Sequence, residues 1–188
     1  MSWRILNDDL DKRDTYDGEV RPTNTAPVIV PHGPKTVSIE NLRWGFKKWD
    51  GQGVIINARV ETLHQKAMFS KLLYTGRCVV PASVYYEWEK VGRDKVKHLI
   101  KDKSGNLLFM AGLYRESPDG GREFVIITKD PDEEVKKIHD RMPAILRVDQ
   151  IEDWFTGRLT PDDISKTSFN MDVVPCNQEY AQLSLEFQ

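Results

Sequence analysis

Three polar residues in largely apolar surroundings could do acid–base chemistry, namely Asn57, Glu87 and His139. His139 ends the segment DPDEEVKKIHD, and an imidazole titrates near neutral pH, so it can give or take a proton. The plainer interpretation is that His139 caps the carboxyl end of a helix, where a cation is favourable. The histidines in a turn, on a polar helix face and on a strand are interpreted as structural: His32, His64 and His98.

Glu87 lies in VYYEWEK, a strand-like segment whose side chains alternate between two faces. The alternation puts Glu87 on one face with Tyr85 and Glu89, and puts Tyr86 and Trp88 on the other. A carboxyl among bulky aromatic rings loses hydration, which raises its pKa toward that of a working acid or base. The alternative is an ordinary exposed carboxylate at a sheet edge.

Asn57 follows the apolar run VII and precedes Arg59 by two residues. A polar side chain at the end of a buried strand needs hydrogen-bond partners. Asn57 could cap a helix that follows it, or it could orient a reacting group. In an extended strand Arg59 would share the face of Asn57, and its guanidinium fork suits a phosphate.

The elements that must position these residues follow from the periodicity of the chain. Alternating or apolar runs predict strands over 26–30, 36–44, 53–59, 77–91, 96–102, 106–116 and 122–130. Helices are predicted over 61–73, 131–139, 149–155 and 161–166. In the first of these, one face carries Leu63, Ala67, Met68 and Leu72. Many short strands and few helices predict an α+β single domain, residues 1–188, on a curved, barrel-like antiparallel sheet.

Composition narrows the class of protein. A chain of 188 residues with 39% hydrophobic and 30% charged residues is typical of one globular domain and not of a disordered protein. It shows neither a membrane-spanning run nor a secretory leader, which predicts an intracellular protein. The net charge of −2 means that a DNA interface must come from a local basic face. Cys78 and Cys176 lack metal-ligand spacing, so we expect unpaired buried thiols and no metal or cofactor.

Six short segments occur in a distinctive order: RPTNTAPV, LRWGF, INARVET, RCVVPASVYYEW, AGLY and IHDRMPAIL. Together they span about residues 21–147, and VVPCN at 173–177 adds a weaker match. In this order they resemble the SRAP family, the SOS response-associated peptidases, which sense abasic sites in single-stranded DNA. Singly, Asn57, Glu87 and His139 do not stand out; the segments around them are what join them into a site.

The resemblance implies a role for each matching residue. Asn57 would orient an N-terminal amine, Glu87 would accept or donate protons during sugar-ring opening and imine formation, and His139 would handle the sugar-side proton and support reversal. The implied DNA contacts, to phosphates or as a wall or stacking surface for a base, are Arg4, Trp44, Arg59 and Arg141.

The N-terminus departs from the family pattern. The family begins Met-Cys-Gly-Arg, and once the methionine is removed the cysteine amine and thiol form a durable thiazolidine with the abasic-site aldehyde. This chain begins Met1-Ser2-Trp3-Arg4, and a serine would give only a less durable oxazolidine. Three interpretations remain open: a natural N-terminus that differs from this one, a variant that binds abasic DNA or cleaves it through a transient imine, or a pocket recruited for another purpose.

The sequence therefore predicts a DNA-repair protein with SRAP-type peptidase, linkage or lyase chemistry. Its expected partner is single-stranded DNA with abasic sites, bound by a cytoplasmic monomer that joins the nucleoid and contacts no membrane. One rival is a non-catalytic single-stranded DNA binding module with the same groove. Another is a peptidase acting on protein substrates, which lacks a recognisable cysteine or Ser/His/Asp nucleophile motif.

Overall fold

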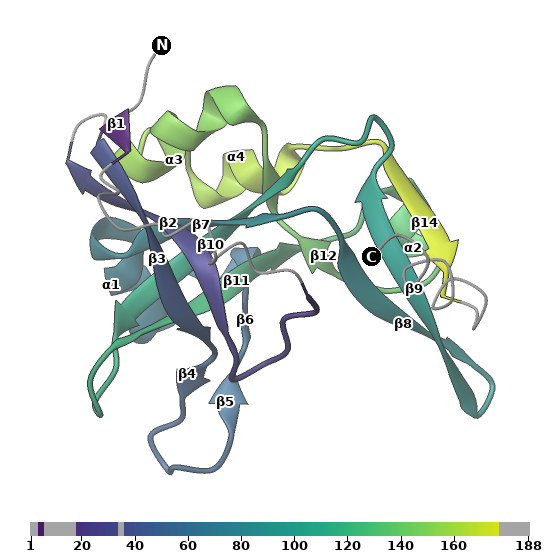
Figure 1. Ribbon diagram of the computed structural model, residues 1–188, viewed down its shortest axis with the longest axis horizontal. Helices are drawn as coiled ribbons and strands as arrows, with labels where there is room; N and C mark the ends of the chain where they lie inside the picture. The colour runs from purple at the N-terminus through teal and green to yellow at the C-terminus, as the bar shows by residue number, and fades with distance from the viewer. Residues whose placement is uncertain (1–3, 6–17, 34–35, 177–188) are drawn as a thin grey trace. The chain divides into compact units, whose positions relative to one another are not determined.

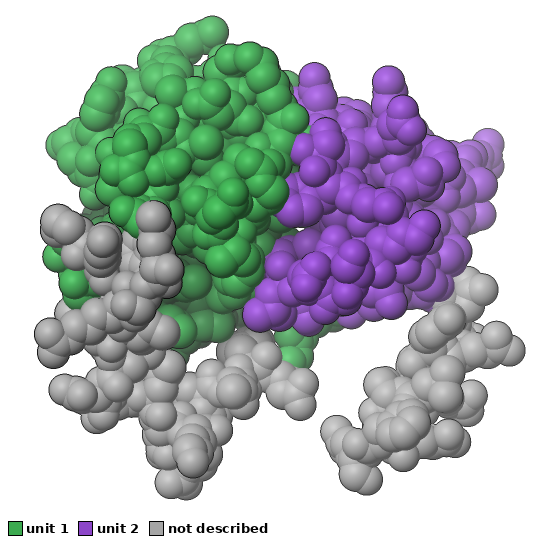
Figure 2. Space-filling model, turned by 90° about the horizontal axis from the view of Figure 1, so that it is seen from above, with its two compact units in different colours: residues 1–81, 109–129, 143–167 green, residues 82–108, 130–142, 168–188 purple. Residues whose placement is uncertain are grey.

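The computed structural model describes residues 4–5, 18–33 and 36–176, with Ser2 outside this range. The chain forms two compact units, coloured separately in Figure 2. Unit 1 comprises residues 1–81, 109–129 and 143–167, and unit 2 comprises 82–108, 130–142 and 168–188. Each unit is therefore assembled from three separate stretches of chain.

The strands and helices are short and follow one another closely (Figure 1). The strands are β1 (Arg4–Ile5), β2 (Thr25–Gly33), β3 (Thr36–Trp44), β4 (Phe46–Lys47), β5 (Val54–Ile55), β6 (Asn57–Arg59), β7 (Arg77–Ala82), β8 (Tyr85–Val91), β9 (Asp94–Asp102), β10 (Leu108–Glu116), β11 (Arg122–Lys129), β12 (Met142–Pro143), β13 (Ile145–Leu146) and β14 (Met171–Pro175). The helices are η1 (Val60–Thr62), α1 (Ala67–Thr75), α2 (Glu133–Lys136), η2 (Val148–Gln150), α3 (Ile151–Thr156) and α4 (Pro161–Lys166).

Unit 1 is built on a sheet whose strand order is β1-β3-β2-β7-β10-β11-β12. Strand β3 pairs with β11 as well as with β2, so five of these strands close a partial ring. The α+β class and the curved sheet are thereby confirmed. The sheet is not purely antiparallel, however, because β1–β3, β3–β11 and β6–β11 are parallel pairs. Such pairs join segments far apart in sequence, which periodicity cannot reveal.

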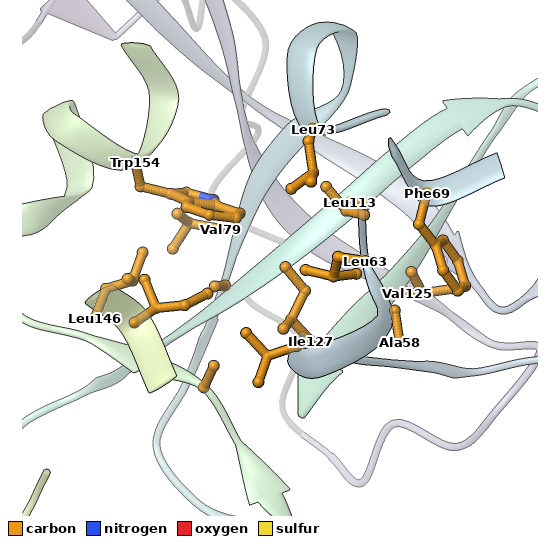
Figure 3. Packing of buried hydrophobic residues seen from close by; sticks show 14 of the residues in the cluster. Ala58, Leu63, Phe69, Leu73, Val79, Leu113, Val125, Ile127, Leu146 and Trp154 are labelled. Carbon is orange, nitrogen blue, oxygen red and sulfur yellow. The ribbon is translucent and has the colours of Figure 1, made fainter. Parts of the chain in front are cut away.

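The core of unit 1 lies between this sheet and its helices (Figure 3). Trp154 of α3, Phe69 and Leu73 of α1, and Val79 of β7 are all buried in it. Fully burying a large apolar side chain contributes roughly 1.5–3 kcal/mol, so this cluster dominates the stability of unit 1.

A buried cation joins the ends of two helices. The Arg77 side chain donates to the carbonyl oxygens of Leu73, at 2.7 Å, Trp154, at 3.0 Å, and Leu159, at 2.7 Å. Its guanidinium also lies 4.2 Å from the ring centroid of Trp154. The last turn of a helix leaves carbonyl oxygens without partners inside the helix, and a cation there is favourable. Arg77 thus acts as a shared C-terminal cap.

Unit 2 contains a three-stranded antiparallel sheet in the order β14-β9-β8. Residues of its inner face are buried, including His98, Ile100 and Met171. The short helix α2 lies against β14, with Val135 buried (Figure 1). The side chain of Asp132, the residue before α2, accepts a 2.8 Å hydrogen bond from the backbone N–H of Phe169. This bond ties the start of α2 to the chain that enters β14.

Several expected boundaries change. The helix predicted over 61–73 is α-helical only from Ala67, because Lys66 is extended and residues 60–62 form the separate turn η1. Phe69 and Leu73 are the buried residues of α1; of the predicted face, Leu63 is buried ahead of α1, Met68 and Leu72 pack partly buried against the same core, and Ala67 is exposed. The helix predicted over 131–139 is reduced to α2, which ends before His139. The strand predicted over 53–59 is divided into β5 and β6.

The remaining expectations fare unevenly. Both cysteines are free, but only Cys78 is buried, whereas Cys176 is half-buried. In the described ranges no group of three or more His, Cys, Asp or Glu residues is placed to hold a metal ion. Among these residues, too, no helix has the length and apolarity needed to cross a membrane.

Candidate active site

Glu87 projects from the inner face of the β8–β9 hairpin. The register pairs Glu87 with His98 and pairs Trp88 with Lys97, so Glu87 shares its face with Tyr85 and Glu89. This confirms the alternation predicted from VYYEWEK. The Glu87 side chain is 24% exposed, so its carboxyl is reachable from solvent but only partly hydrated. The alternative of a freely exposed edge carboxylate is therefore wrong.

His139 lies just beyond the end of α2. Its backbone N–H donates to the carbonyl of Val135 at 2.9 Å, which holds the residue on the last turn. Its Nε2 lies 3.5 Å from Oε2 of Glu87, and its side chain is 33% exposed. Glu87 and His139, which lie on different stretches of the chain, are thus brought together as an acid–imidazole pair.

The other ring nitrogen of His139 is satisfied in either protonation state. Nδ1 lies 3.0 Å from the carbonyl oxygen of Arg141 and 3.1 Å from its backbone nitrogen. A protonated Nδ1 can donate to the carbonyl, and an unprotonated Nδ1 can accept from the N–H. His139 can therefore exchange the proton on Nε2 without losing its partner at Nδ1, which suits a proton shuttle.

The electrostatics of Glu87 raise its pKa above the ordinary value for a glutamate. Burial raises the pKa of Glu87, the charge of His139 and the backbone N–H of Trp88 oppose that rise, and the Asp140 carboxylate adds to it. The pKa of Glu87 is raised overall, because the effect of burial outweighs the opposing effects of His139 and the Trp88 N–H. A glutamate of this kind can donate a proton closer to neutral pH than an ordinary one.

A cleft of about 590 Å³ opens beside this pair within unit 2. It is lined by Asp130, Pro131 and residues 136–140, so His139 faces it directly. Lys136 and Lys137 line it together with the carboxylates of Asp130 and Asp140, and Lys137 pairs with Glu134 at 2.6 Å. The guanidinium of Arg141, a predicted phosphate ligand, makes a 2.8 Å hydrogen bond to Asp130. That bond holds the Arg141 side chain next to the cleft.

Unit 1 carries the remaining predicted residues. Asn57 and Arg59 are exposed on β6, with buried Ala58 between them, and β6 pairs in parallel with β11. The interpretation of Asn57 as a helix cap is wrong, because η1 starts at Val60 with Arg59 as its N-cap residue. Asn57 and Arg59 share one face of β6, as expected for a strand. The roles of Asn57 in orienting an amine and of Arg59 in binding DNA stay predictions.

Trp44 ends β3 with its ring already engaged. Its indole N–H donates to the carbonyl of Ile56 at 3.0 Å, and its ring stacks on Phe124 at 6.4 Å and an interplanar angle of 12°. Of the two predicted roles, this packing favours the pocket wall over stacking on a base. The backbone of Arg4 lies in β1, while its side chain and Ser2 are outside the described residues.

Sequence reasoning missed two exposed aromatic groups. Trp49 lies in the turn between β4 and β5 with its side chain fully exposed, directly after Lys47 and Lys48. On the outer face of the β8–β9 hairpin, Lys97 lies 3.9 Å from the ring centroid of Tyr86 and 5.6 Å from that of Trp88. Tryptophan beside lysine in a glycine-bounded turn, KKWDGQG, is the signal that could have found the first.

Comparisons with known proteins agree with one another. The family model described as SOS response associated peptidase (SRAP) matches residues 3–180. The abasic site processing protein YoqW of Bacillus subtilis is 37% identical over 163 residues, covering 78% of this chain and 72% of the relative. The abasic site processing protein YedK of Escherichia coli is 28% identical over 183 residues, covering 93% and 82%. A crystal structure of a Bacteroides thetaiotaomicron protein superposes with a TM-score of 0.69 at 26% identity, over 85% of this chain and 77% of that one.

Proposed function

This chain belongs to the SRAP family, and from that premise we propose that it recognises abasic sites in single-stranded DNA and reacts with them through the Glu87–His139 pair. The observation that carries the proposal is a half-buried carboxyl of raised pKa, 3.5 Å from a histidine that faces a cleft. Relatives whose names include abasic site processing support the choice of substrate.

The proposed reaction begins at the ring-opened sugar. The α-amine of Ser2, freed when Met1 is removed, adds to the aldehyde carbon, and the carbonyl oxygen takes up a proton to give a carbinolamine. Glu87 donates a proton to that hydroxyl, which leaves as water as the nitrogen lone pair forms a protonated imine. The imine nitrogen then gives up its proton to His139, which passes that proton to the Glu87 carboxylate and so restores both side chains. An α-amine is partly unprotonated at neutral pH, so the addition needs no stronger base.

The replacement of cysteine by Ser2 shapes the expected product. The serine hydroxyl can add to the imine carbon and close an oxazolidine, which reopens more readily than a thiazolidine. We therefore expect a linkage that forms and reverses, with strand cleavage through the imine as its side product. The same replacement is what favours the second candidate, a binding module that retains the groove without chemistry.

DNA contacts would come from local clusters, because the net charge of the chain is −2. Lys136 and Lys137 at the cleft, Arg59 on β6 and Lys48 beside Trp49 are suited to phosphates, and exposed tryptophan suits unstacked bases. We further propose that residues 1–188 function together as one SRAP-like domain, a monomer acting in the cytoplasm, where the DNA is.

One experiment tests the reaction. The protein is incubated with a single-stranded oligonucleotide carrying one abasic site, and denaturing gels are run with and without borohydride. A band that requires borohydride supports the imine, whereas a band that survives without reductant contradicts the oxazolidine. An oligonucleotide carrying tetrahydrofuran in place of the abasic sugar lacks the aldehyde and controls for adventitious linkage.

The remaining outcomes separate the rivals. A shift on native gels with neither covalent band supports the binding module, and no interaction with DNA overturns the proposal. Cleavage of a generic protein substrate at comparable rates would favour the peptidase. Intact-mass measurement of the protein shows whether Met1 is removed.

A further inference from the structure

The hydroxyl of Tyr85 is buried and has no hydrogen-bond partner among the residues that the structure describes. Buried polar groups are almost always paired, because an unpaired donor forfeits its bonds to water without replacing them. A phenol could have been avoided at this position, since phenylalanine has the same ring. The unpaired Tyr85 hydroxyl therefore calls for a functional reason.

Tyr85 precedes Glu87 by two residues on the same face of β8. Burial raises the pKa of Tyr85, and the negative charges of Glu87 and Asp132 raise it further, so the phenol stays protonated and is always a donor. Of these two carboxylates, Asp132 accepts the backbone N–H of Phe169 at 2.8 Å. Glu87 is the one that shares a strand face with Tyr85, and its charge raises the pKa of Tyr85 more than the charge of Asp132 does.

The groups around Glu87 show which other donors could bind its carboxylate in place of the Tyr85 hydroxyl. From β8 it is flanked by Tyr85 and Glu89, from β9 by the opposite residue His98, and from the chain after α2 by His139 and Asp140. His98 is nearer to a different acid, with its Nε2 3.5 Å from Glu89. Glu87 accepts the backbone N–H of Trp88 and lies 3.5 Å from Nε2 of His139, which leaves it fewer donors than the roughly four that a carboxylate can accept.

We propose that Tyr85 is a positioning residue whose hydroxyl donates to Glu87 only when Glu87 is ionised. The structure shows the hydroxyl unpaired, and we assign this arrangement to the state in which Glu87 holds its proton. Once the proton has gone to the substrate, the phenol turns to the carboxylate and stabilises it until His139 returns a proton. The catalytic part of this role rests on the proposed function, whereas the Tyr85–Glu87 bond itself does not.

The test compares Tyr85→Phe with Tyr86→Phe. Each removes one hydroxyl and keeps the ring, but Tyr86 lies on the opposite face, under Lys97. Carbon-13 NMR titration of the glutamate side-chain carboxyls follows Glu87 directly, with Glu87→Gln to assign its signal. Loss of a donor to the ionised form should move the Glu87 titration upward by about one pH unit, a tenfold change in its ionisation constant. Tyr86→Phe should leave it in place.

Thermal melts supply a second measurement without DNA. Below the titration of Glu87, where the hydroxyl is unpaired, Tyr85→Phe should melt no lower than the natural protein. Above it, the variant should melt lower, because only then is a bond missing. A Glu87 titration unchanged in Tyr85→Phe, or a melting difference that does not vary with pH, would overturn the proposal.

The DNA reaction is tested independently of the Tyr85–Glu87 bond. If the natural protein gives no borohydride-dependent band while the NMR titration shifts as expected, the proposed function is wrong and the Tyr85–Glu87 bond stands. If the natural protein links to DNA and Tyr85→Phe moves the alkaline limb of the rate–pH profile, where Glu87 loses the proton that it donates, to higher pH without changing DNA affinity, the catalytic role is supported. A coincident pH profile for Tyr85→Phe overturns that role.

Discussion

Glu123 in unit 1 and Glu87 in unit 2 are both shielded from water, yet their carboxyls are held in opposite ways. Burial alone would raise the pKa of Glu123, but hydrogen bonds from Arg43, Ser117, the backbone N–H of Lys47 and Arg115 outweigh it, and the pKa is lowered. Glu87 has far fewer donors, and its pKa is raised. The number of donors, more than the depth of burial, decides whether a glutamate holds a charge or a proton.

The two environments have different consequences. The Glu123 cluster fixes β4, because Arg115 donates to the carbonyl of Lys47 at 2.8 Å while Glu123 accepts the Lys47 N–H at 3.1 Å. The Glu87 environment supplies few hydrogen bonds, and the pKa of this carboxyl is raised. Unit 1 thus uses a glutamate to hold backbone, whereas we propose that unit 2 uses one for proton transfer.

The largest effect is expected from Glu123→Gln. Removing the charge leaves Arg43 and Arg115 facing a neutral amide in a buried position, so the free energy of unfolding should fall by about 3 kcal/mol. Urea denaturation measures it. Glu116→Gln is the control, because Glu116 is 70% exposed and its pair with Arg122 should be worth well under about 1 kcal/mol. Equal losses in the two variants would refute the contrast.

Glu87→Gln should separate chemistry from stability. An amide cannot donate an acidic proton, so the rate of the borohydride-dependent DNA linkage should fall by about 100-fold or more. The free energy of unfolding should stay within about 1 kcal/mol, since few bonds depend on the carboxylate. Glu89→Gln, on the same strand and face, is the matched control. A Glu87→Gln protein that unfolds readily would mean that Glu87 is structural after all.

Trp49→Ala should weaken binding to single-stranded DNA by about tenfold, because a stacked base contributes roughly 1–3 kcal/mol. Fluorescence anisotropy with an intact oligonucleotide measures it. Tyr74 is also exposed, on α1, and Tyr74→Ala should leave the affinity unchanged. If the Glu123 cluster serves to hold the β4–β5 turn, Trp49→Ala should leave the melting temperature unchanged as well. Equal affinities for the two variants would exclude Trp49 as a contact.

The smallest effect is expected in the pH dependence of stability, which should have opposite signs for Glu87 and Glu123. Glu87 has a raised pKa, so the stability it contributes is present at low pH and is lost as the pH rises through its folded-state value. Glu123 has a lowered pKa, so its contribution is present above the unfolded-state value, near 4.3, and is lost as the pH falls through its folded-state value. For each Gln variant, the difference in melting temperature from the natural protein should change between pH 3 and 8, and the two variants should change in opposite directions. Parallel slopes would contradict the assigned directions.

Local signals in the sequence predicted part of the fold well. Strands β2 and β3 were predicted from an apolar run and from alternation, and the helix predicted over 161–166 is α4, which Thr160 and Asp163 begin with a capping box. The helix over 61–73 was too long because periodicity does not register an extended residue such as Lys66. The ring closure of β3 onto β11 depends on long-range pairing and left no local trace.

The candidate site, too, could be predicted only in part from the sequence. The face of Glu87 followed from strand alternation alone, but its approach to His139 did not, because the contact depends on how α2 is tied to β14. Only the ordered family segments indicated that the two residues belong together. The unpaired hydroxyl of Tyr85 could not be predicted either, since the pairing of a side chain is decided by the whole of its surroundings.

Arg77 has a consequence for the order in which the chain can fold during synthesis. Two of its carbonyl partners lie 77 and 82 residues farther along the chain, in α3 and just after it. The end of α1 therefore cannot be locked until residue 159 has left the ribosome, by which time the strands of the ring are already available. Until then the guanidinium remains in water and gives α1 a hydrated, frayed end. Unit 1 therefore completes its folding late in synthesis, because Arg77 is made long before the carbonyls in and just after α3 that it binds.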